Sequence, residues 1–304
     1  MTGATAVAEY VRARRAEVEA RLATLLPAPP DCPAAVADAM HYSLTAGGKR
    51  LRPVLCLASA EAVGGSTAAV LPAACAIELI HTYSLVHDDL PAMDDDSMRR
   101  GRPTLHIVAG EGMAILAGDG LLTEAFHVLA GLQGDPARVL RAIQLIAAAA
   151  GPVGMVGGQA IDLACVTHDP QGRIAAPLDG AGLAAMHAKK TGALIRASAA
   201  AGAVLGGGTE AQIGAVEAAA TEFGLAFQIV DDILDVEGDA AQLGKSPGKD
   251  AAAGKPTYPA LYGIARSRQM ADECVGRASD TLSAAGMAGS WLVGIGRWIV
   301  ERKN

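Results

Sequence analysis

The sequence predicts an all-α fold, a bundle of long helices that forms one domain over residues 1–304. Three observations favour this fold. Aromatic residues make up 3% of the chain, and alanine runs such as residues 147–150 stand where strands favour Val, Tyr, Thr or Phe. Apolar residues recur at helical spacing, without alternating strands and without an internal repeat. A chain of 304 residues is also close to the limit of about 250–300 residues for a single hydrophobic core.

Glycine and proline separate the expected helices. The first, 4–25, ends in the proline-rich sequence LPAPPDCP, which no helix crosses. The second, 34–46, ends at Gly47 and Gly48, which favour a left-handed helix cap. Two long polar loops, 91–103 and 238–258, are typical of functional segments. Further helices are expected over 51–63, 67–90, 111–133, 137–150, 153–165, 181–202, 209–237, 259–283 and 288–302.

Composition excludes several classes of protein. A hydrophobic content of 51% excludes intrinsic disorder, and a net charge of −7 gives no basis for binding nucleic acid. The five cysteines are scattered without a C-x-x-C motif, which indicates neither a zinc site nor a disulfide framework and fits a reducing compartment. Glu9 and Arg12 interrupt any apolar core of a signal peptide, so we expect a cytoplasmic protein. Pro152 and several glycines interrupt the apolar stretch 142–161, so we expect a buried helix there and no membrane span.

The first acidic cluster, HDDLPAMDDD, follows a long apolar segment. Asp88 and Asp89 at the end of a helix repel each other and oppose the helix dipole, so a positive charge must compensate them. Pro91 cannot continue the helix, and its position indicates that residues 94–96 fold back toward Asp88. We interpret His87 as a packing residue rather than a metal ligand.

The second acidic cluster lies in FQIVDDILD. Asp231 and Asp235 are four residues apart and share one helix face, with Asp232 beside them. Carboxylate oxygens without neighbouring His or Cys ligands suit Mg²⁺ rather than zinc. Either cluster alone could be a solvated helix end, but two such clusters within apolar helices favour a metal site.

Basic residues gather near these clusters. Such a concentration in an acidic protein indicates an anionic substrate, for which a diphosphate is the natural candidate. Taken singly, the stretch with Lys49, Arg50 and Arg52 could cap a helix, and the pair Lys189 and Lys190 could be a solvated face. The stretch that contains Lys245, Lys249 and Lys255 lacks the spacing of a P-loop. Eleven of the 25 basic residues lie in four stretches: Lys49, Arg50 and Arg52; Arg99, Arg100 and Arg102; Lys189 and Lys190; Lys245, Lys249 and Lys255.

From about residue 40 to 262 the chain resembles the trans-isoprenyl diphosphate synthases, also called polyprenyl synthetases. The resemblance implies an isoprenoid synthase fold, in which long helices surround a deep central cavity, and usually a homodimer. It places two aspartate motifs opposite each other at the cavity mouth. Seven motifs occur in the family's order: GGKRLRP, DDLPAMD followed by RRG, GGQAID, KTG, FQIVDDILD and GKSPGKD.

The resemblance also assigns site residues, none of them after Tyr262. Metal ligands for three Mg²⁺ on the allylic diphosphate would be Asp88, Asp89, Asp94, Asp231, Asp232 and Asp235. Contacts to that substrate would come from Arg99, Lys190, Thr191, Gln228, Lys245 and Lys255, of which the first four carry the catalytic role. Isopentenyl diphosphate would bind Lys49, Arg52, His81 and Arg100.

The expected reaction is ionisation of an allylic diphosphate, attack by isopentenyl diphosphate, and loss of a proton to the released diphosphate. Cations that bind the departing diphosphate lower the barrier, so no protein nucleophile is required. No Ser-His-Asp or Cys-His arrangement is evident, and we assign no catalytic role to the following histidines: His41, His106, His127 and His168.

The length of the product is expected to depend on Tyr83 and Ser84, about one helical turn before Asp88. The aromatic residue at 83 and the four residues between Asp89 and Asp94 resemble bacterial farnesyl diphosphate synthases, which stop at fifteen carbons. Tyr83 could instead be a core residue, and a geranylgeranyl diphosphate synthase is the alternative product assignment.

Two other classes remain open. A terpene cyclase shares the fold but usually alters the second aspartate motif and lines its cavity with aromatics, whereas this chain has ten aromatic residues and an intact DDILD. A non-catalytic partner subunit commonly lacks one aspartate motif, and both are present here.

Overall fold

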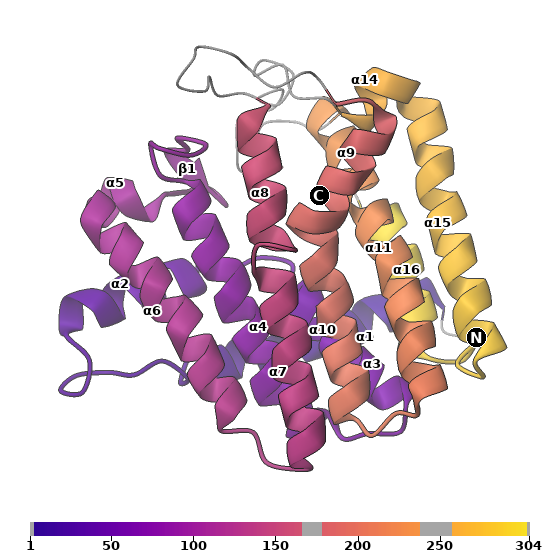
Figure 1. Cartoon of the computed structure of the whole chain (residues 1–304), viewed down its shortest axis with the longest axis horizontal. Coiled ribbons are helices and arrows are strands. Elements are labelled where there is room, and N and C mark those ends of the chain that lie inside the picture. Colours follow the sequence, from indigo (N-terminus) through magenta and orange to yellow (C-terminus); the bar gives the residue numbers. More distant parts are fainter. Residues whose placement is uncertain (1–2, 166–177, 238–256, 303–304) are drawn as a thin grey trace.

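The computed structural model describes residues 3–165, 178–237 and 257–302 and confirms an all-α fold (Figure 1). Its first half contains α1 (Ala4–Leu22), α2 (Ala34–Leu44), α3 (Leu51–Ala62), α4 (Thr67–Asp88), α5 (Leu105–Ala109), α6 (Glu111–Ala130), α7 (Pro136–Ala150) and α8 (Met155–Ala164). The second half contains α9 (Gly180–His187), a π-helical turn η1 (Ala188–Gly192), α10 (Ala193–Leu205), α11 (Glu210–Glu237), α14 (Tyr258–Tyr262), α15 (Ile264–Ala284) and α16 (Trp291–Glu301).

The expected helices are present, with ends that differ by a few residues. The expected helix 181–202 is interrupted by the π-helical turn η1, and the expected helix 259–283 is broken at Gly263, whose φ of +78° ends α14. The expected loop 91–103 carries a short antiparallel hairpin that the sequence did not reveal, in which Met98 pairs with Pro103. Residues 238–256 of the second expected loop lie outside the described residues.

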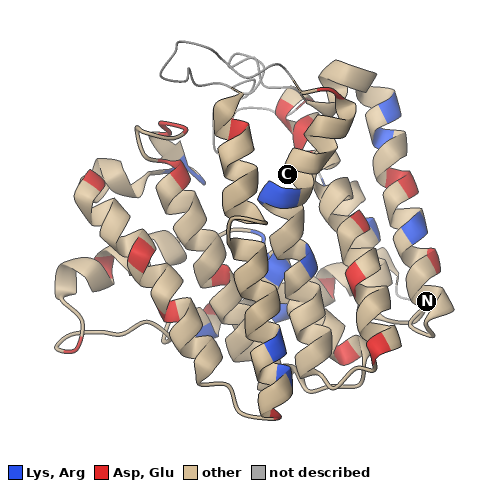
Figure 2. Cartoon of the chain, viewed as in Figure 1, with Lys and Arg blue, Asp and Glu red and all other residues tan. Residues whose placement is uncertain are grey.

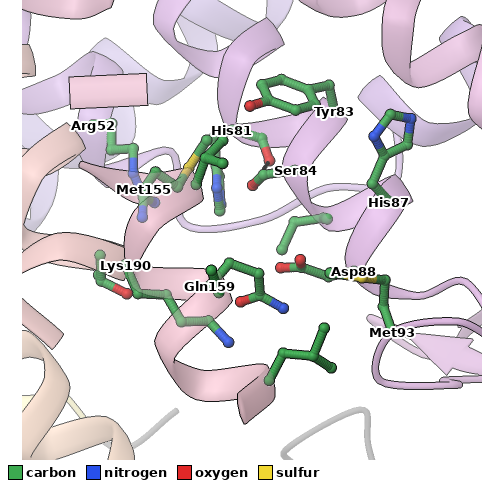
Figure 3. A pocket seen from close by; sticks show the side chains of 15 residues that line it. Arg52, His81, Tyr83, Ser84, His87, Asp88, Met93, Met155, Gln159 and Lys190 are labelled. Atoms are coloured by element: carbon green, nitrogen blue, oxygen red, sulfur yellow. Dashed lines mark hydrogen bonds between the residues drawn. The ribbon is translucent and has the colours of Figure 1, made fainter. Parts of the chain in front are cut away.

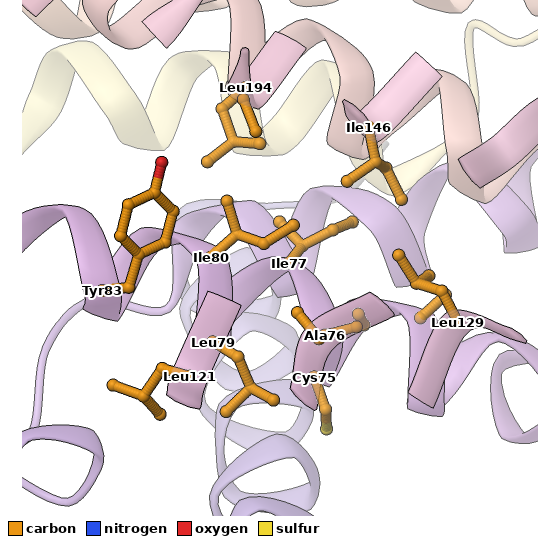
Figure 4. Close-up of a cluster of buried hydrophobic side chains, with 14 of the residues drawn as sticks. Cys75, Ala76, Ile77, Leu79, Ile80, Tyr83, Leu121, Leu129, Ile146 and Leu194 are labelled. Atoms are coloured by element: carbon orange, nitrogen blue, oxygen red, sulfur yellow. The ribbon is translucent and has the colours of Figure 1, made fainter. Parts of the chain in front are cut away.

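The hydrophobic core consists of two clusters that share helices α3 and α10. Leu57 and Leu194 belong to one cluster, while Leu55 and Ile195, which project in other directions from the same helices, belong to the other. Figure 4 shows Leu194 close to Ile80 and Ile77 of α4 in the first cluster. The sharing of α3 and α10 supports the prediction of a single domain over residues 1–304, which stays a prediction.

Helices α3 and α10 run parallel in direct backbone contact. A Cβ atom on Gly202 would lie 2.0 Å from the carbonyl oxygen of Cys56, and one on Gly206 would lie 2.8 Å from the Cα of Ala60. The contact advances by four residues on both helices, so their amino-terminal ends lie at the same end of the bundle. Those two ends carry the cationic stretches that begin with Lys49 and Lys189.

By length and composition, four segments could cross a membrane: Thr67–Asp88, Glu111–Ala130, Pro136–Ala164 and Glu210–Glu237. The first is two-thirds buried and the last is half buried inside the protein. The other two are only one-third buried. The prediction of one buried helix over 142–161 is therefore wrong, because this stretch is divided between α7 and α8 and is only partly buried.

We predict that Gly202→Ala destabilises the protein. The added methyl group cannot be accommodated unless α3 and α10 separate, and overpacking of this kind costs about 1–3 kcal/mol. The control is Gly214→Ala in α11, where a Cβ meets nothing within 4 Å and the better helix propensity of Ala stabilises by up to about 1 kcal/mol. Thermal unfolding of both variants tests this, and equal melting temperatures would contradict it.

Candidate functional site

A cavity of about 370 Å³ opens between α3, α4, α8 and the π-helical turn (Figure 3). Its walls are mainly apolar, with charged groups from α3, α4 and the turn. Figure 2 shows acidic residues in the loop after α4 and basic residues in the turn between α9 and α10, both toward the end of the bundle drawn at the top. Seven of the predicted site residues line the cavity: Arg52, His81, Tyr83, Ser84, Asp88, Lys190 and Thr191.

The first aspartate cluster folds back as predicted. Helix α4 ends at Asp88, and the amide of Asp94 then donates to the carbonyl oxygen of Asp88 at 2.9 Å. The compensating positive charge is Arg99, which contacts the Asp89 carboxylate at 2.5 and 2.7 Å and lies 3.5 Å from Asp96. Arg99 and Asp89 face a small hollow beside the main cavity rather than the cavity itself.

Asp88 is the acidic residue of this cluster that lines the cavity. Burial raises the pKa of its carboxyl group to about 6, and the positive charge of Lys190 acts in the opposite direction. Burial also raises the pKa of Asp89, while its hydrogen bond from Arg99 lowers it. An anion in this position is poorly solvated, so a bound cation would stabilise it.

The second cluster occupies the last turns of α11, with Asp232 and Asp235 buried. Asp232 accepts a hydrogen bond from the amide of Tyr258 at 2.9 Å, and its carboxylate lies 4.0 Å from the ring of His187. The other ring nitrogen of His187 lies 3.0 Å from the side-chain amide of Gln228. The predicted site residue Gln228 is therefore held beside the second cluster.

Asp231 is held by two cations that come from distant parts of the chain. The ammonium of Lys49 lies 4.0 Å from its carboxylate, and the guanidinium of Arg302 lies 2.6 Å away. The Arg302 side chain is buried, also donates to the carbonyl of Phe227 at 2.9 Å, and stacks on the Phe227 ring at 4.1 Å. Sequence reasoning assigned nothing after Tyr262 and missed Arg302, because a lone arginine near the end of the chain carries no spacing signal.

The cationic wall of the cavity is formed by Arg52, with Arg100 nearby, and His81 lines the cavity beside them. Burial lowers the pKa of Arg52 to about 10, with Glu78 and Asp231 opposing that change. Burial and four neighbouring arginines hold the pKa of His81 well below its ordinary value, so its imidazole is neutral. Burial also lowers the pKa of Arg100. This wall holds several positive charges together and is suited to an anionic ligand.

The loop before α3 is built around two arginines. Arg50, at a φ of +52°, forms a buried 2.7 Å ion pair with Glu78 of α4 and donates to the carbonyl of Leu44. Arg100 donates to the carbonyl of Gly47, and a Cβ on Gly48 would meet the Arg100 guanidinium. Arg50 therefore caps the carboxyl end of α2 as well as pairing with α4, so the alternative that this stretch caps a helix holds for Arg50, whereas Arg52 lines the cavity.

Lys190 is positioned by Asp162, a residue that the sequence analysis did not single out. Its ammonium donates to the buried Asp162 carboxylate at 2.6 Å. Helix α8 lies against the π-helical turn, because a Cβ on Gly158 would come within 2.1 Å of the Lys190 amide nitrogen. The motif GGQAID contained this signal, since its glycine allows the close contact and its aspartate faces the lysine.

The two aspartate clusters lie around one set of cations. Arg52 lines the cavity that contains Asp88, and its pKa responds to the charge of Asp231. Within the described ranges no three Asp, Glu, His or Cys side chains form a preformed metal site. The donor set nevertheless fits Mg²⁺, because it is made of carboxylate oxygens and includes a buried carboxylate of raised pKa. Lys245 and Lys255 lie outside the described residues.

Tyr83 lines the cavity one turn before Asp88 and is also a member of the first core cluster, so its core packing is confirmed, while its control of product length stays a prediction. Its ring meets the edge of His87 at 5.8 Å between centroids, and His87 lies 3.1 Å from the carbonyl oxygen of Ile115 in α6. His87 thus packs between α4 and α6, as interpreted from the sequence. Ser84 donates to the carbonyl of His81 at 2.9 Å.

Known proteins resemble this chain in sequence and in fold. Residues 33–285 match the family described as Polyprenyl synthetase. The chain is 47% identical to the large subunit 1 of a heterodimeric geranylgeranyl pyrophosphate synthase from Arabidopsis thaliana over 257 residues, which is 82% of this chain and 67% of that protein.

Two solved structures share the whole architecture. A FPP/GFPP synthase from Zymomonas mobilis, in its apo form, superposes with a TM-score of 0.85 at 36% identity, covering 98% of this chain and 99% of that one. A geranyltransferase from Helicobacter pylori complexed with magnesium and isoprenyl diphosphate superposes with a TM-score of 0.82 at 30% identity, covering 96% and 95%. This chain belongs to the polyprenyl synthetase family, the Mg²⁺-dependent prenyltransferases that its motifs resembled.

Proposed function

We propose that this chain condenses isopentenyl diphosphate with dimethylallyl and geranyl diphosphate to give farnesyl diphosphate. The observation that carries the proposal is the cavity itself. It has a poorly solvated carboxylate, Asp88, beside the cation Lys190, and Tyr83 stands in its wall one turn away. A diphosphate bound near the charged groups would direct its hydrocarbon chain along the apolar wall.

The chain's own residues bind and orient the diphosphate. Lys190, held by Asp162, places a positive charge beside Asp88, where negative charge grows as the allylic carbon–oxygen bond breaks. In this proposal Arg99, Thr191 and Gln228, together with Lys245 and Lys255, complete the allylic site. When bound by the six aspartates, three Mg²⁺ ions would neutralise the departing diphosphate.

Isopentenyl diphosphate would bind in the cavity against the cationic wall. Arg52 and Arg100 both lower the pKa of His81, and Arg100 also lowers the pKa of Arg52. Lys49 belongs to the same stretch as Arg52. The neutral imidazole of His81 can donate a hydrogen bond without adding to the local positive charge. The proton released after carbon–carbon bond formation passes to the diphosphate product, so no protein base is assigned.

The length of the product has two candidates, the farnesyl chain proposed here and a geranylgeranyl chain. Tyr83 and Ser84 support fifteen carbons, because their side chains line the cavity close to Asp88. The relatives favour a geranylgeranyl product, since the Arabidopsis thaliana protein is named a geranylgeranyl pyrophosphate synthase subunit. The FPP/GFPP synthase from Zymomonas mobilis is named for two products, one shorter and one longer than a geranylgeranyl chain.

We also propose that the enzyme is a cytoplasmic homodimer. An exposed apolar surface on α5 and α6, containing Ile107, Val108, Ile115 and Leu116, supports self-association. The described cysteines are free, which suits a reducing compartment. A heterodimer is the alternative, because the Arabidopsis thaliana relative is named as a large subunit.

The proposal is tested by incubating the purified chain alone with Mg²⁺, isopentenyl diphosphate and an allylic primer. Chromatography of the dephosphorylated products then identifies the activity. Linear prenyl alcohols are expected, with fifteen carbons the longest main product. Cyclic hydrocarbons would indicate a terpene cyclase, and no product would indicate a subunit that modulates another synthase.

We expect that Asp88→Asn and Asp232→Asn each lower kcat/KM by about 100-fold or more, because each removes a charge that stabilises the transition state through bound metal. The matched control is Asp272→Asn, an exposed aspartate on α15. Steady-state kinetics with geranyl diphosphate measures the effect. Activity within a few fold of the unmodified enzyme for either variant would remove that cluster from the mechanism.

We expect that Tyr83→Ala shifts the products toward twenty carbons or more, because removal of the ring lengthens the apolar cavity. Tyr83→Phe keeps the ring and should preserve the product distribution, which separates the steric effect from the loss of a hydroxyl group. Product chromatography from both variants provides the test. An unchanged distribution in Tyr83→Ala would show that the ring does not limit the product.

A further inference from the structure

The cavity face of α8 contributes a polar group that no part of the proposed mechanism uses. Gln159 and Asp162 are three residues apart on this helix and therefore project from the same side. Asp162 holds Lys190, and Gly158 brings the α8 backbone into contact with the backbone of Lys190. Gln159 thus lies on the wall that positions the cation of the allylic site.

The side chain of Gln159 is buried but unsatisfied. It is 9% exposed and lines the cavity, yet neither its amide nitrogen nor its amide oxygen has a hydrogen-bond partner among the residues that the structure describes. Leaving such a group without partners destabilises the folded protein, and the large majority of buried side-chain amides in proteins have hydrogen-bond partners. Gln159 lines the cavity, and its unsatisfied amide therefore indicates a ligand contact.

The position of the amide suggests which part of the ligand it meets. In Figure 3 the Gln159 side chain lies between those of Lys190 and Asp88. These two residues would flank the allylic diphosphate, whereas the cationic wall at Arg52 and His81 lies across the cavity. The amide nitrogen has two hydrogens to donate, and diphosphate oxygens are strong acceptors.

We infer that Gln159 is a further substrate-binding residue, whose amide nitrogen donates a hydrogen bond to the diphosphate of the allylic substrate. This inference rests on the proposed function. A glutamine that only fills space would be expected to find a partner within the protein. The unpaired amide of Gln159 instead destabilises the free enzyme, and a hydrogen bond to the substrate would remove this destabilisation. Functional sites commonly show such a trade-off between stability and activity.

The test combines ligand binding with thermal unfolding of Gln159→Leu, which keeps a similar size and removes the polar atoms. Calorimetry with Mg²⁺ and dimethylallyl S-thiolodiphosphate, an allylic analogue that resists ionisation, should give a dissociation constant about 10-fold or more higher than that of the unmodified enzyme. The melting temperature of the free variant should rise by about 2 °C, because an unpaired buried amide is gone. Gln144→Leu, at an exposed position on α7, is the control and should change neither value.

A second variant covers the case in which Gln159→Leu does not fold. Gln159→Glu retains the shape but replaces the donor with a carboxylate that repels a diphosphate, so it should also weaken binding by about 10-fold or more. Unchanged binding of the analogue by either variant overturns the inference, and so does weaker binding by Gln159→Leu accompanied by a lower melting temperature. If the unmodified enzyme fails to bind the analogue in the presence of Mg²⁺, the proposed function itself is wrong, and the two failures are distinguished.

Discussion

Burial of charge is the constraint on which this site depends. Taking a carboxylate or a guanidinium out of water costs several kcal/mol unless an opposite charge or a hydrogen bond replaces the solvent. Ion pairs offset this cost in the bundle: Arg50 with Glu78, Arg99 with Asp89, Lys190 with Asp162, and Arg302 with Asp231. The groups whose pKa values shift most clearly in the cavity are Asp88, Arg52 and His81. Burial thus leaves the charges of Asp88 and Arg52 poorly solvated, and a ligand of opposite charge would stabilise each of them.

The positions of these charges follow from close backbone packing. Gly202 allows α3 and α10 to touch, which brings the amino-terminal end of α3, with Arg52, and the turn that carries Lys190 to the same end of the bundle. Gly158 then brings α8 against that turn, so that Asp162 reaches Lys190. Small residues far from the reacting atoms therefore fix the geometry of the cationic groups.

Much of this arrangement could be predicted from local pattern. The helices followed from composition and from glycine and proline positions, and the fold-back after Asp88 followed from Pro91, because proline cannot continue a helix. The carboxylate spacing of Asp231 and Asp235 indicated one helix face. These features depend on neighbours in the sequence, and for that reason sequence reasoning reached them.

The contributions that it missed depend on contacts between distant segments. Arg302 reaches Asp231 across 71 positions, and Asp162 reaches Lys190 across 28, so neither pair has a local signature. The π-helical turn that presents Lys190 was read as continuous helix, because AKKTG is compatible with either form. The amide of Gln159 has no hydrogen-bond partner in the part of the chain that the structure describes, a feature that became apparent through burial and that no spacing in GGQAID encodes.

In the proposed mechanism both aspartate clusters act on one bound diphosphate. Calorimetric titration of inorganic diphosphate in the presence of Mg²⁺ tests it most directly, with Asp88→Asn, Asp232→Asn and the double variant compared in one cycle. If the clusters share a ligand, each single change removes most of the affinity and the double variant binds scarcely more weakly than either single one, a strong departure from additivity. Losses of affinity that add independently, or a cluster whose change leaves the affinity intact, would contradict the account.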